Sequence, residues 1–260
     1  MPQFNQITPV QLMRLIGTPE APALLDLRPP EDRSAWRIPT AIPCGLAPPN
    51  LAPNARVVVI CTRGAKRSEG MAALLRLQGH AAEVLEGGHL AWEAAGLPLT
   101  PEAALPASRL WVTRHRPKID RIVCPWLIRR FVDPGAQFLY VAPTEVAAVA
   151  DTFGATPFDI EGATFSHRGA LCSLDALIAD FGLGHPALDR LALVVRAADT
   201  DAHDLSPQAA GLLAISVGLS RMYRCDLAQL EAGMGVYDAL YRWARDGFDE
   251  GHDWPAGRQA

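Results

Sequence analysis

The fold follows from the stretch Val57-Val58-Val59-Ile60-Cys61-Thr62-Arg63-Gly64-Ala65-Lys66-Arg67-Ser68, which predicts a buried strand, a tight loop and the start of a helix. The four apolar residues 57–60 suit a strand that is covered on both faces, as the strands of a parallel sheet are. Ser68 is a residue type that caps helices, so we expect a helix over 68–78 that Gly79 closes. A strand, a short loop and a helix in this order form one unit of an α/β sheet.

Short apolar runs on either side of this unit predict two more strands. Residues 23–26 (Ala-Leu-Leu-Asp) and 82–85 (Ala-Glu-Val-Leu) have the length and the apolar content of buried strands. An amphipathic helix is expected over 8–16, with Thr8 as its cap. Strands that alternate with helices indicate a parallel sheet, so residues 1–97 are predicted to form an α/β domain.

Cys61 and the loop after it are the strongest candidate site of the chain. The expected anion-binding loop consists of Thr62, Arg63, Gly64, Ala65, Lys66, Arg67 and Ser68. The backbone N–H groups of such a loop point inward at a helix N-terminus, and together with the cations they would stabilise a thiolate. We therefore expect Cys61 to have a lowered pKa and to act as a nucleophile. The alternative is a cysteine that ends a strand beside an ordinary loop.

Three further segments, together with the cysteine loop, resemble the rhodanese family over residues 4–100. They are Asp26-Leu27-Arg28, Arg37-Ile38-Pro39-Thr40-Ala41 and Glu86-Gly87-Gly88-His89-Leu90-Ala91-Trp92. The resemblance implies a sulfurtransferase in which Cys61 takes a sulfane sulfur from a small donor, carries it as a persulfide and passes it to a thiophilic acceptor, with no cofactor required. The loop amides and Arg67 would hold the leaving anion. Asp26 and Arg28 would be framework residues.

The length of the loop leaves a second chemistry open. Five residues separate Cys61 from Arg67, one more than in typical sulfurtransferases of the family. This Cys-x5-Arg spacing resembles that of phosphatases with the same fold and of related arsenate reductases. If Lys66 takes the place of the arginine instead, the loop keeps sulfurtransferase length. The first alternative function is therefore a phosphatase, or a reductase that acts on an oxyanion such as chromate or arsenate.

A proline-rich segment separates this domain from the rest of the chain. Three prolines between residues 98 and 106 exclude a continuous helix there, so 98–108 is predicted to be a linker. A second domain is expected over 109–246, and a tail rich in glycine and aspartate over 247–260.

The second domain is predicted to be helix-rich α+β. Its expected strands are 110–113 and 137–141. Helices are expected over 125–131, 144–153, 173–181, 186–198, 206–219 and 227–245. Pro125 would open the first of these helices, and Gly233 and Gly235 would be weak points of the last.

The charges of the second domain are unevenly distributed. Residues 109–130 hold seven basic residues and one acid, whereas 131–260 hold eight basic and eighteen acidic residues. Three hypotheses follow for the basic segment: a solvated face paired with the acidic remainder, a small-anion site, or a nucleic-acid surface. The anion site would be a helix N-terminus with Lys118, Arg121 and Arg129. The net charge of the chain, −4, argues against nucleic acid as a partner.

A second constellation has the residue types of a metal site. His167 and Cys172 lie close together in the sequence, and Asp199 and Asp201 form a second pair. Imidazole, thiolate and carboxylate groups from two loops can converge on a divalent metal ion. Their spacing matches no compact zinc motif, and the alternative is that they cap helices or bond local backbone amides. His167 and Asp199 are the first expected ligands, followed by Cys172 and Asp201.

Long segments of the second domain resemble the chromate-resistance proteins of the ChrB-like group over residues 109–246. Among them are Thr113-Arg114, Pro157-Phe158-Asp159, His167-Arg168-Gly169, Cys172-Ser173-Leu174-Asp175-Ala176 and Arg196-Ala197-Ala198-Asp199-Thr200. The resemblance implies a role in chromate resistance or chromate sensing, and the sensing form is a transcriptional regulator. In this chain a rhodanese-like domain lies in front, with no helix-turn-helix pattern, which argues against DNA binding.

The sequence predicts a cytoplasmic protein with no membrane partner. Its 260 residues suffice for two domains, and a hydrophobic content of 49% excludes a disordered chain. Five cysteines are too few for a disulfide scaffold, and no apolar run approaches the roughly 18 residues of a membrane span. Residues 1–5 lack the features of a secretion signal. We expect sulfur transfer through Cys61 coupled to an oxyanion-responsive domain, and a non-enzymatic chromate or metal sensor is the second alternative.

Overall fold

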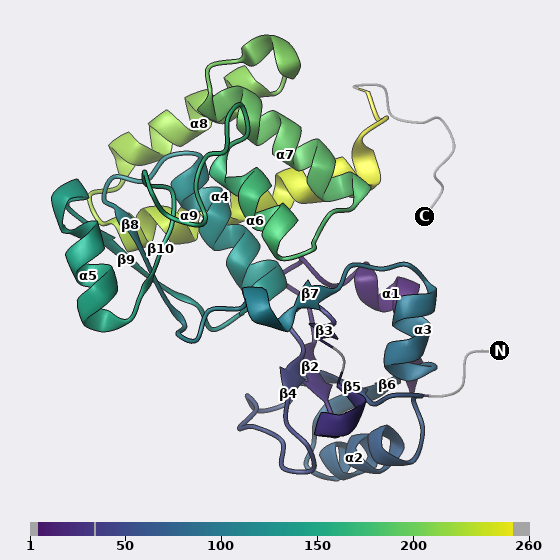
Figure 1. Ribbon diagram of the computed structural model, residues 1–260. Helices are drawn as coiled ribbons and strands as arrows, with labels where there is room; N and C mark the ends of the chain where they lie inside the picture. The colour runs from purple at the N-terminus through teal and green to yellow at the C-terminus, as the bar shows by residue number, and fades with distance from the viewer. Residues whose placement is uncertain (1–4, 34, 252–260) are drawn as a thin grey trace.

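Five parallel strands form the sheet of the N-terminal domain, in the order β1-β6-β5-β2-β4 (Figure 1). The computed structural model of the protein describes residues 5–33 and 35–251. The strands are β1 (Gln6–Ile7), β2 (Ala23–Asp26), β4 (Ile42–Pro43), β5 (Arg56–Ile60) and β6 (Ala81–Leu85). α1 (Pro9–Met13), a 3-10 turn at Pro30–Asp32 and α2 (Lys66–Leu77) lie between these strands in the chain, and α3 (Gly88–Ala94) follows β6. The predicted parallel α/β domain is confirmed.

The ends of the first two helices show which capping predictions hold. Thr8 caps α1 as predicted: its Oγ1 accepts the Gln11 amide at 3.2 Å, and the Gln11 side chain accepts the Thr8 amide at 3.0 Å. Gly79 follows α2 with φ +88°, in the left-handed region that commonly closes a helix, also as predicted. Ser68 does not cap α2, contrary to our prediction, because the helix begins two residues earlier, at Lys66. The Ser68 hydroxyl turns back to the cysteine loop instead.

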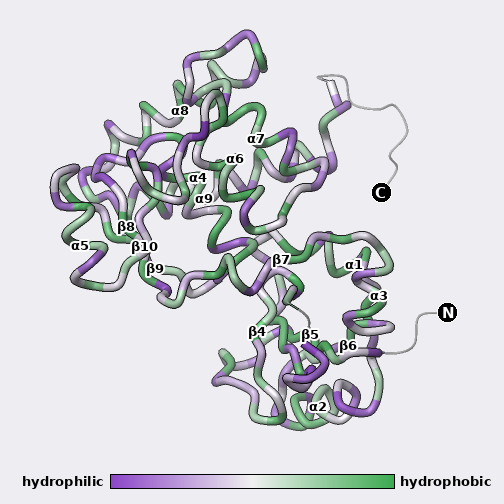
Figure 2. Tube along the Cα trace, in the orientation of Figure 1, coloured by the Kyte–Doolittle hydropathy of each residue, from purple (hydrophilic) through white to green (hydrophobic). Residues whose placement is uncertain are grey.

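Alternate residues of β5 face two different hydrophobic cores. Val57 and Val59 pack with residues of α2 in a small core on one face of the sheet. Val58 and Ile60 belong to a larger core on the other face, which includes Trp92 of α3. This larger core continues into the second domain. Burial on both faces explains why the strand is apolar along almost its whole length (Figure 2).

The proline-rich segment after α3 packs against both domains. β7 (Thr100–Pro101) pairs antiparallel with β3 (Trp36–Arg37), and a 3-10 turn follows at Glu102–Ala104. The indole N–H of Trp92 donates to the Pro98 carbonyl at 2.9 Å. Partly buried leucines of the segment lie against the larger core. The residues that we predicted as a linker are therefore held in place by a strand pairing and by apolar contacts.

The second domain contains a three-stranded parallel sheet in the order β10-β8-β9 (Figure 1). Its strands are β8 (Leu110–Arg114), β9 (Gln137–Val141) and β10 (Thr156–Pro157). α5 (Val146–Phe153), which follows a 3-10 turn at Pro143–Glu145, packs on β8. The remaining helices are α4 (Asp120–Leu127), α6 (Ser173–Asp180), α7 (Pro186–Asp199), α8 (Ala209–Met222) and α9 (Asp226–Arg242), with a 3-10 turn at His203–Leu205. The domain is helix-rich, as predicted.

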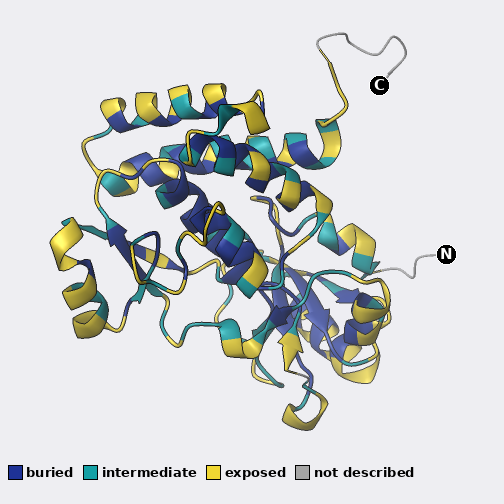
Figure 3. Ribbon diagram, turned by 45° about the horizontal axis from the view of Figure 1, so that its top comes forward, coloured by how far each residue is buried: buried dark blue, intermediate teal, exposed yellow. Residues whose placement is uncertain are grey.

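α4 begins at Asp120, five residues before the helix start predicted at Pro125. Seven of its eight residues are buried, and it runs through the interior of the domain (Figure 3). Pro125 has no N–H for the Arg121 carbonyl one turn earlier, and the Tyr140 hydroxyl donates to that carbonyl at 2.8 Å instead. The proline is therefore tolerated inside the helix, which continues as a π-helical turn at Ile128–Val132.

α9 is continuous through Gly233 and Gly235, which we predicted as weak points. A Cβ at Gly233 would lie 2.6 Å from Cγ2 of Ile122, so the glycine allows α4 and α9 to pack closely. A π-helical turn at Trp243–Gly247 follows, and most of the predicted tail lies outside the described residues. No helix within the described ranges combines the length and the apolarity that a membrane crossing requires. All five cysteines are free thiols.

Candidate functional site

Cys61 lies where β5 ends and the chain turns towards α2, and 7% of the residue is exposed. Its Sγ accepts the Ala65 N–H at 3.3 Å and lies 3.1 Å from the Ser68 hydroxyl oxygen. The Ser68 hydroxyl is also 2.9 Å from the Ala65 carbonyl oxygen. The loop thus surrounds the sulfur with hydrogen-bonding groups at a helix N-terminus, which is an environment that favours a negative charge.

Two opposing effects set the pKa of Cys61. Burial, the largest single effect, raises the pKa because it disfavours the charged thiolate. Hydrogen bonds from the Ser68 hydroxyl and from the backbone of Ala65, Arg63 and Ser68 together lower the pKa by more. The pKa of Cys61 therefore lies below that of an ordinary cysteine, and the loop favours the nucleophilic form of the sulfur.

The cationic side chains of the loop point to solvent. Arg63, Lys66 and Arg67 are exposed, and none of their side chains forms an ion pair or hydrogen bond with another described residue. We predicted that these cations stabilise the thiolate, but the main effects that lower its pKa are hydrogen bonds. Lys66 and Arg67 are the first two residues of α2 and both are exposed, whereas Ser68 in the same turn is buried against the sulfur. Thr62 is held differently, since its hydroxyl donates to Asp32 at 2.7 Å.

The backbone of Gly88 packs directly against the cysteine loop. The amide of His89, the next residue, donates to the Cys61 carbonyl at 2.9 Å. A Cβ at Gly88 would lie 2.5 Å from the Gly64 nitrogen and closer still to the Cys61 carbonyl oxygen. Gly88 also has φ +63°, in the left-handed region that favours glycine. The loop keeps its shape because this position has no side chain.

We expect Gly88→Ala to lower the free energy of unfolding by about 2–4 kcal/mol, through backbone strain and the clash with the loop. Gly96→Ala is the matched control, because Gly96 has the same φ of +63° and nothing within 4 Å of a Cβ. It should cost only about 1 kcal/mol, for the left-handed backbone alone. Urea unfolding of both full-length variants measures the difference. Equal losses of unfolding free energy in the two variants would show that the close contact of Gly88 with the loop does not contribute to stability.

Ser68→Ala is expected to raise the pKa of Cys61, because the variant lacks the hydroxyl that lies 3.1 Å from the sulfur. A raised pKa means less thiolate at pH 7, so the rate of alkylation by iodoacetamide should fall roughly tenfold there. At high pH, where both proteins are thiolates, the two rates should converge. Ser68→Thr keeps the hydroxyl and should recover part of the rate. A Ser68→Ala profile that coincides with the wild-type profile would contradict the assignment.

Asp26 and Arg28 form a buried ion pair at the end of β2. The Arg28 side chain is 2% exposed, and its Nη2 lies 2.8 Å from Oδ2 of Asp26. Its Nε donates to both carboxylate oxygens at 3.1 Å, and Nη2 also donates to the Trp36 carbonyl at 3.3 Å. Asp26 pairs in register with Ile60, the residue before Cys61. This ion pair therefore lies beside the strand end that carries the sulfur.

Three aspartates and one histidine converge in the second domain. Nε2 of His167 lies 3.1 Å from Oδ2 of Asp199, 3.5 Å from Oδ2 of Asp120 and 3.5 Å from Oδ1 of Asp159. One ligand atom from each of Asp120, His167 and Asp199 falls within 4.8 Å of the others. We call these four residues the Asp3His cluster. Carboxylates and an imidazole at this spacing have the chemistry to hold a metal ion.

Four segments of the chain build the Asp3His cluster. Asp120 is the first residue of α4, and Asp199 is the last residue of α7. Asp159 follows β10 with φ +50°, and His167 lies in the loop before α6. Ile119, directly before Asp120, has φ +39°, which is an unusual backbone conformation for a β-branched residue. Strained backbone beside two of the aspartates is a feature that is typical of functional sites.

The residues of the cluster shift one another's pKa. A hydrogen bond to Asp120, together with the charges of the three aspartates, raises the pKa of His167 to about 9, although burial lowers it. Burial and the charges of Asp120 and Asp159 raise the pKa of Asp199 to about 7. Burial also raises the pKa of Asp159. The negative charges of the cluster therefore favour any cation that can approach them.

The cluster contains two of the four metal ligands predicted from the sequence, His167 and Asp199. Contrary to our prediction, the other two do not join it. Cys172 is fully buried, and its side chain accepts a hydrogen bond at the N-terminus of α6. Asp201 has a side chain that is 96% exposed and lies near His203 instead.

Asp120 and Asp159 belong to the cluster but are not predicted as ligands by the sequence. Residues 109–130 contain seven basic residues and a single acid, Asp120, which is buried. Asp159 ends the segment Pro157-Phe158-Asp159, which carries part of the family resemblance. An isolated acid in a basic segment is therefore the signal that points to this site.

Five of the seven basic side chains of 109–130 form ion pairs. The pairs are Arg109–Asp133, Arg114–Asp159, Arg121–Asp159, Arg129–Glu231 and Arg130–Asp238. The anion site that we predicted at Lys118, Arg121 and Arg129 is not formed, because the two arginines pair with different acids and Lys118 is exposed. The geometry supports the hypothesis of a basic face paired with the acidic remainder, and it gives no support to a nucleic-acid surface.

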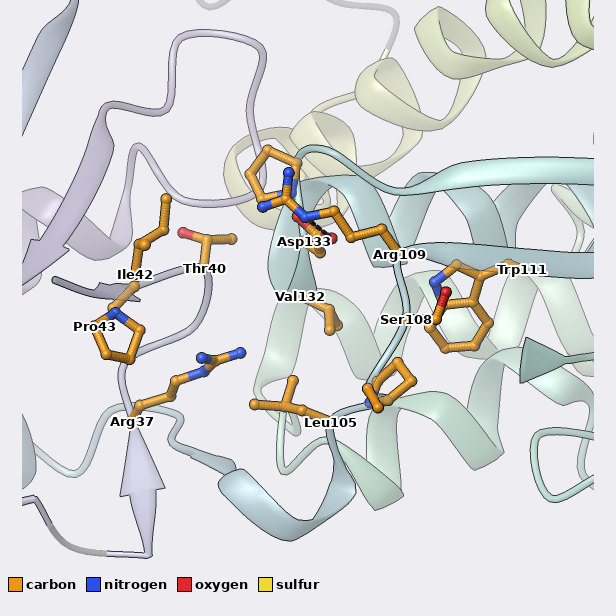
Figure 4. A pocket seen from close by; sticks show the side chains of 14 residues that line it. Arg37, Thr40, Ile42, Pro43, Leu105, Ser108, Arg109, Trp111, Val132 and Asp133 are labelled. Atoms are coloured by element: carbon orange, nitrogen blue, oxygen red, sulfur yellow. Dashed lines mark ion pairs between the residues drawn. The ribbon is translucent and has the colours of Figure 1, made fainter. Parts of the chain in front are cut away.

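A pocket of about 230 Å³ lies between the two domains (Figure 4). Arg37 and Thr40 line it from the N-terminal domain. Arg109 and Asp133 line it from the second domain, where they form an ion pair at 3.2 Å. No thiol or imidazole of the described residues lines this pocket, and neither Cys61 nor the Asp3His cluster lies in it.

Comparisons with known proteins match the two domains separately. The family "Rhodanese-like domain" matches residues 8–95, and the family "ChrB, C-terminal domain" matches residues 111–244. Protein ChrB of Cupriavidus metallidurans is 37% identical over 134 residues, which are 51% of this chain and 40% of that protein. The chain therefore covers less than half of that relative. A solved rhodanese-related protein from Thermoplasma volcanium is 23% identical with a TM-score of 0.32, over 37% of this chain and 97% of that protein.

Proposed function

Because this chain belongs to the family of the ChrB C-terminal domain and carries a rhodanese-like domain in front of it, we propose that it is a sulfurtransferase that acts through Cys61. The observation that carries the proposal is the environment of the Cys61 sulfur. The sulfur accepts a backbone amide, lies 3.1 Å from a serine hydroxyl and has a lowered pKa. A hydrogen-bonded thiolate at a helix N-terminus is suited to nucleophilic attack.

The proposed reaction has two displacement steps and needs no cofactor. In the first, the Cys61 thiolate attacks the outer sulfur of a donor such as thiosulfate. The new S–S bond forms as the old one breaks, and sulfite leaves with the electron pair of the old bond. The product is a Cys61 persulfide anion, which the backbone of the loop stabilises by hydrogen bonds. In the second step a thiophilic acceptor such as cyanide attacks the outer sulfur, thiocyanate leaves, and the thiolate is restored.

The exposure of Arg67 favours sulfur transfer over the oxyanion chemistry of the alternative function. A Cys-x5-Arg phosphatase or reductase needs its arginine to bind the equatorial oxygens of a tetrahedral anion beside the sulfur. The Arg67 side chain is exposed and has no hydrogen bond to the described part of the loop. The first turn of α2 instead brings the Ser68 hydroxyl to the sulfur. A sulfur atom requires less space and fewer donors than an oxyanion.

The test is to detect the persulfide itself. Full-length protein is incubated with thiosulfate, and the mass of each cysteine-containing peptide is measured. We expect one added sulfur atom on the Cys61 peptide of the wild type and none in Cys61→Ser. Cys225→Ser, which removes an exposed thiol, should leave the adduct on Cys61 unchanged. The proposal fails if the wild type forms no adduct, and hydrolysis of an aryl phosphate would favour the alternative.

The second domain would connect this chemistry to oxyanion stress. Its family resemblance implies a role in chromate resistance, and chromate is a tetrahedral oxyanion that oxidises thiols. Persulfide chemistry on Cys61 would supply reduced sulfur to a cell under that stress. Five free thiols fit a reducing compartment such as the cytoplasm. Most basic side chains of 109–130 are already paired with acidic residues of this chain. This pairing favours a role in chromate resistance over DNA binding by the same segment.

A further inference from the structure

We propose that the Asp3His cluster, formed by Asp120, Asp159, Asp199 and His167, is a binding site for a hard divalent cation such as Mn²⁺. All three carboxylates lie within 3.5 Å of the same imidazole nitrogen, so their oxygens surround a common point. Potential ligand atoms of Asp120, His167 and Asp199 also lie within 4.8 Å of one another. This spacing suits a single ion bound by all of them.

Asp120 provides an independent reason to expect a ligand. The residue is 1% exposed, and its Oδ1 is buried without a hydrogen-bond partner among the described residues. A buried carboxylate oxygen without a partner is costly, so such atoms usually serve a site. The other oxygen, Oδ2, accepts the Ser173 amide at 2.6 Å. Oδ2 is also the atom that lies 3.5 Å from Nε2 of His167, so the carboxylate is turned into the cluster while Oδ1 still has no partner among the described residues.

The surrounding hydrogen bonds hold the ligands in place before any ion arrives. The Ser173 hydroxyl donates to Oδ1 of Asp159 at 2.8 Å, so one residue positions two of the aspartates. The strained residue Ile119 is fixed by the Ser216 hydroxyl, 3.0 Å from its nitrogen, and by the Tyr237 hydroxyl, 3.2 Å from its oxygen. Such outer contacts are what orient ligands around a metal ion.

The donor set selects the kind of ion. Three carboxylates and one imidazole offer mainly oxygen, which suits Mn²⁺ or Mg²⁺, and the imidazole favours the transition metal of the two. The nearby thiol of Cys172 is bound at the start of its own helix and adds no soft ligand. Arg114 and Arg121 lie beside Asp159 and offset part of the negative charge on one side. The three carboxylates outnumber these two guanidinium groups, so the cluster keeps a net negative charge that attracts a cation.

An ion can reach the cluster from the surface. The His167 side chain is 40% exposed and forms the outer wall of the cluster. A cavity of about 520 Å³ adjoins it, lined by Arg114, Asp159, His167 and the loop over 160–166. One side of the bound ion would therefore face solvent, and the Arg114 side chain would lie at the edge of that opening. A site with an open side can exchange its ion and accept an additional ligand.

The test is to titrate metal-free full-length protein with MnCl₂ and follow the electron paramagnetic resonance signal of free Mn²⁺. Manganese is the probe because it avoids the thiols that bind zinc. We expect one ion per chain and a Tm that rises with MnCl₂ concentration. Asp199→Asn and His167→Gln should weaken binding by roughly 10–100-fold. Both residues are at least partly exposed, so these variants should fold even if Asp120→Asn does not.

Asp201→Asn is the matched control, because it makes the same chemical change two residues from Asp199 on a side chain outside the cluster. Its affinity for Mn²⁺ should equal that of the wild type. Cys61→Ser should also bind Mn²⁺ normally, so the site can fail or succeed independently of sulfur transfer. Absence of binding by the wild type at millimolar MnCl₂ would overturn the proposal. Unchanged binding by Asp199→Asn would overturn it as well.

Discussion

Replacing Cys61 with serine is expected to reduce thiosulfate:cyanide sulfur transfer by at least roughly a thousandfold. A serine hydroxyl is not ionised at neutral pH, and it cannot carry a sulfane sulfur as a persulfide. The loop should keep its shape in this variant, because the His89 amide and the Ser68 hydroxyl bond backbone carbonyls and the serine oxygen can accept the Ala65 amide in place of the sulfur. The measurement is the initial rate of thiocyanate formation by full-length wild type and variant at equal concentration.

The other cysteines provide the control for this prediction. Cys225 is an exposed thiol, and Cys225→Ser should keep the wild-type rate. If Cys61→Ser retains most of the activity while Cys225→Ser loses it, the sulfur passes through an unspecific surface thiol. A wild-type rate no higher than that of Cys61→Ser would mean that the rhodanese-like domain serves this chain without sulfur transfer.

Asp26→Asn is expected to lower the free energy of unfolding by about 3–5 kcal/mol. The guanidinium of Arg28 is 2% exposed and is held by both carboxylate oxygens of Asp26. Asparagine has no charge, so the variant would leave a cation buried without a counterion. Thermal and urea unfolding of the full chain measure the loss. The double variant Asp26→Leu/Arg28→Met should lose less than Asp26→Asn, because it removes both charges together.

An exposed ion pair of the same sheet is the control for burial. Arg56 and Glu83 pair across β5 and β6 at 3.1 Å, and both side chains are partly exposed. Glu83→Gln makes a chemical change equivalent to that of Asp26→Asn, and it should cost only about 0–1 kcal/mol. Similar losses in the two variants would show that the buried pair has no special role in stability.

Most of the N-terminal domain could be predicted from local sequence. The apolar run 57–60 and its neighbours are strands, and Thr8 caps the first helix, because these features depend on residues close together in the chain. The role of Ser68 could not be predicted in the same way. Its hydroxyl had two partners available, a helix amide or the Cys61 sulfur, and only the folded loop decides between them. The predicted anion-binding loop includes Ser68, but the contact of its hydroxyl with the sulfur was not predicted.

Several features of the second domain depend on contacts between residues that are distant in the sequence, so local patterns could not predict them. Pro125 suggests a helix start, but Tyr140 of β9 satisfies the carbonyl that the proline leaves free, so the helix begins earlier, at Asp120. This shift places Asp120 in the Asp3His cluster. The ligands of the cluster come from four segments between residues 120 and 199, so no spacing motif could reveal them. The anion site predicted at Lys118, Arg121 and Arg129 is not formed, because the acids that pair with the two arginines are distant in the sequence.

The larger hydrophobic core joins residues that are synthesised at very different times. Synthesis proceeds from the N-terminus, so the N-terminal sheet emerges from the ribosome before the residues that cover part of one of its faces have been made. Gly17, for example, lies against the ring of Phe131, which is translated more than a hundred residues later. During that interval the nascent chain exposes apolar surface to chaperones and to neighbouring nascent chains. Prematurely terminated chains should therefore aggregate more readily than the full-length protein.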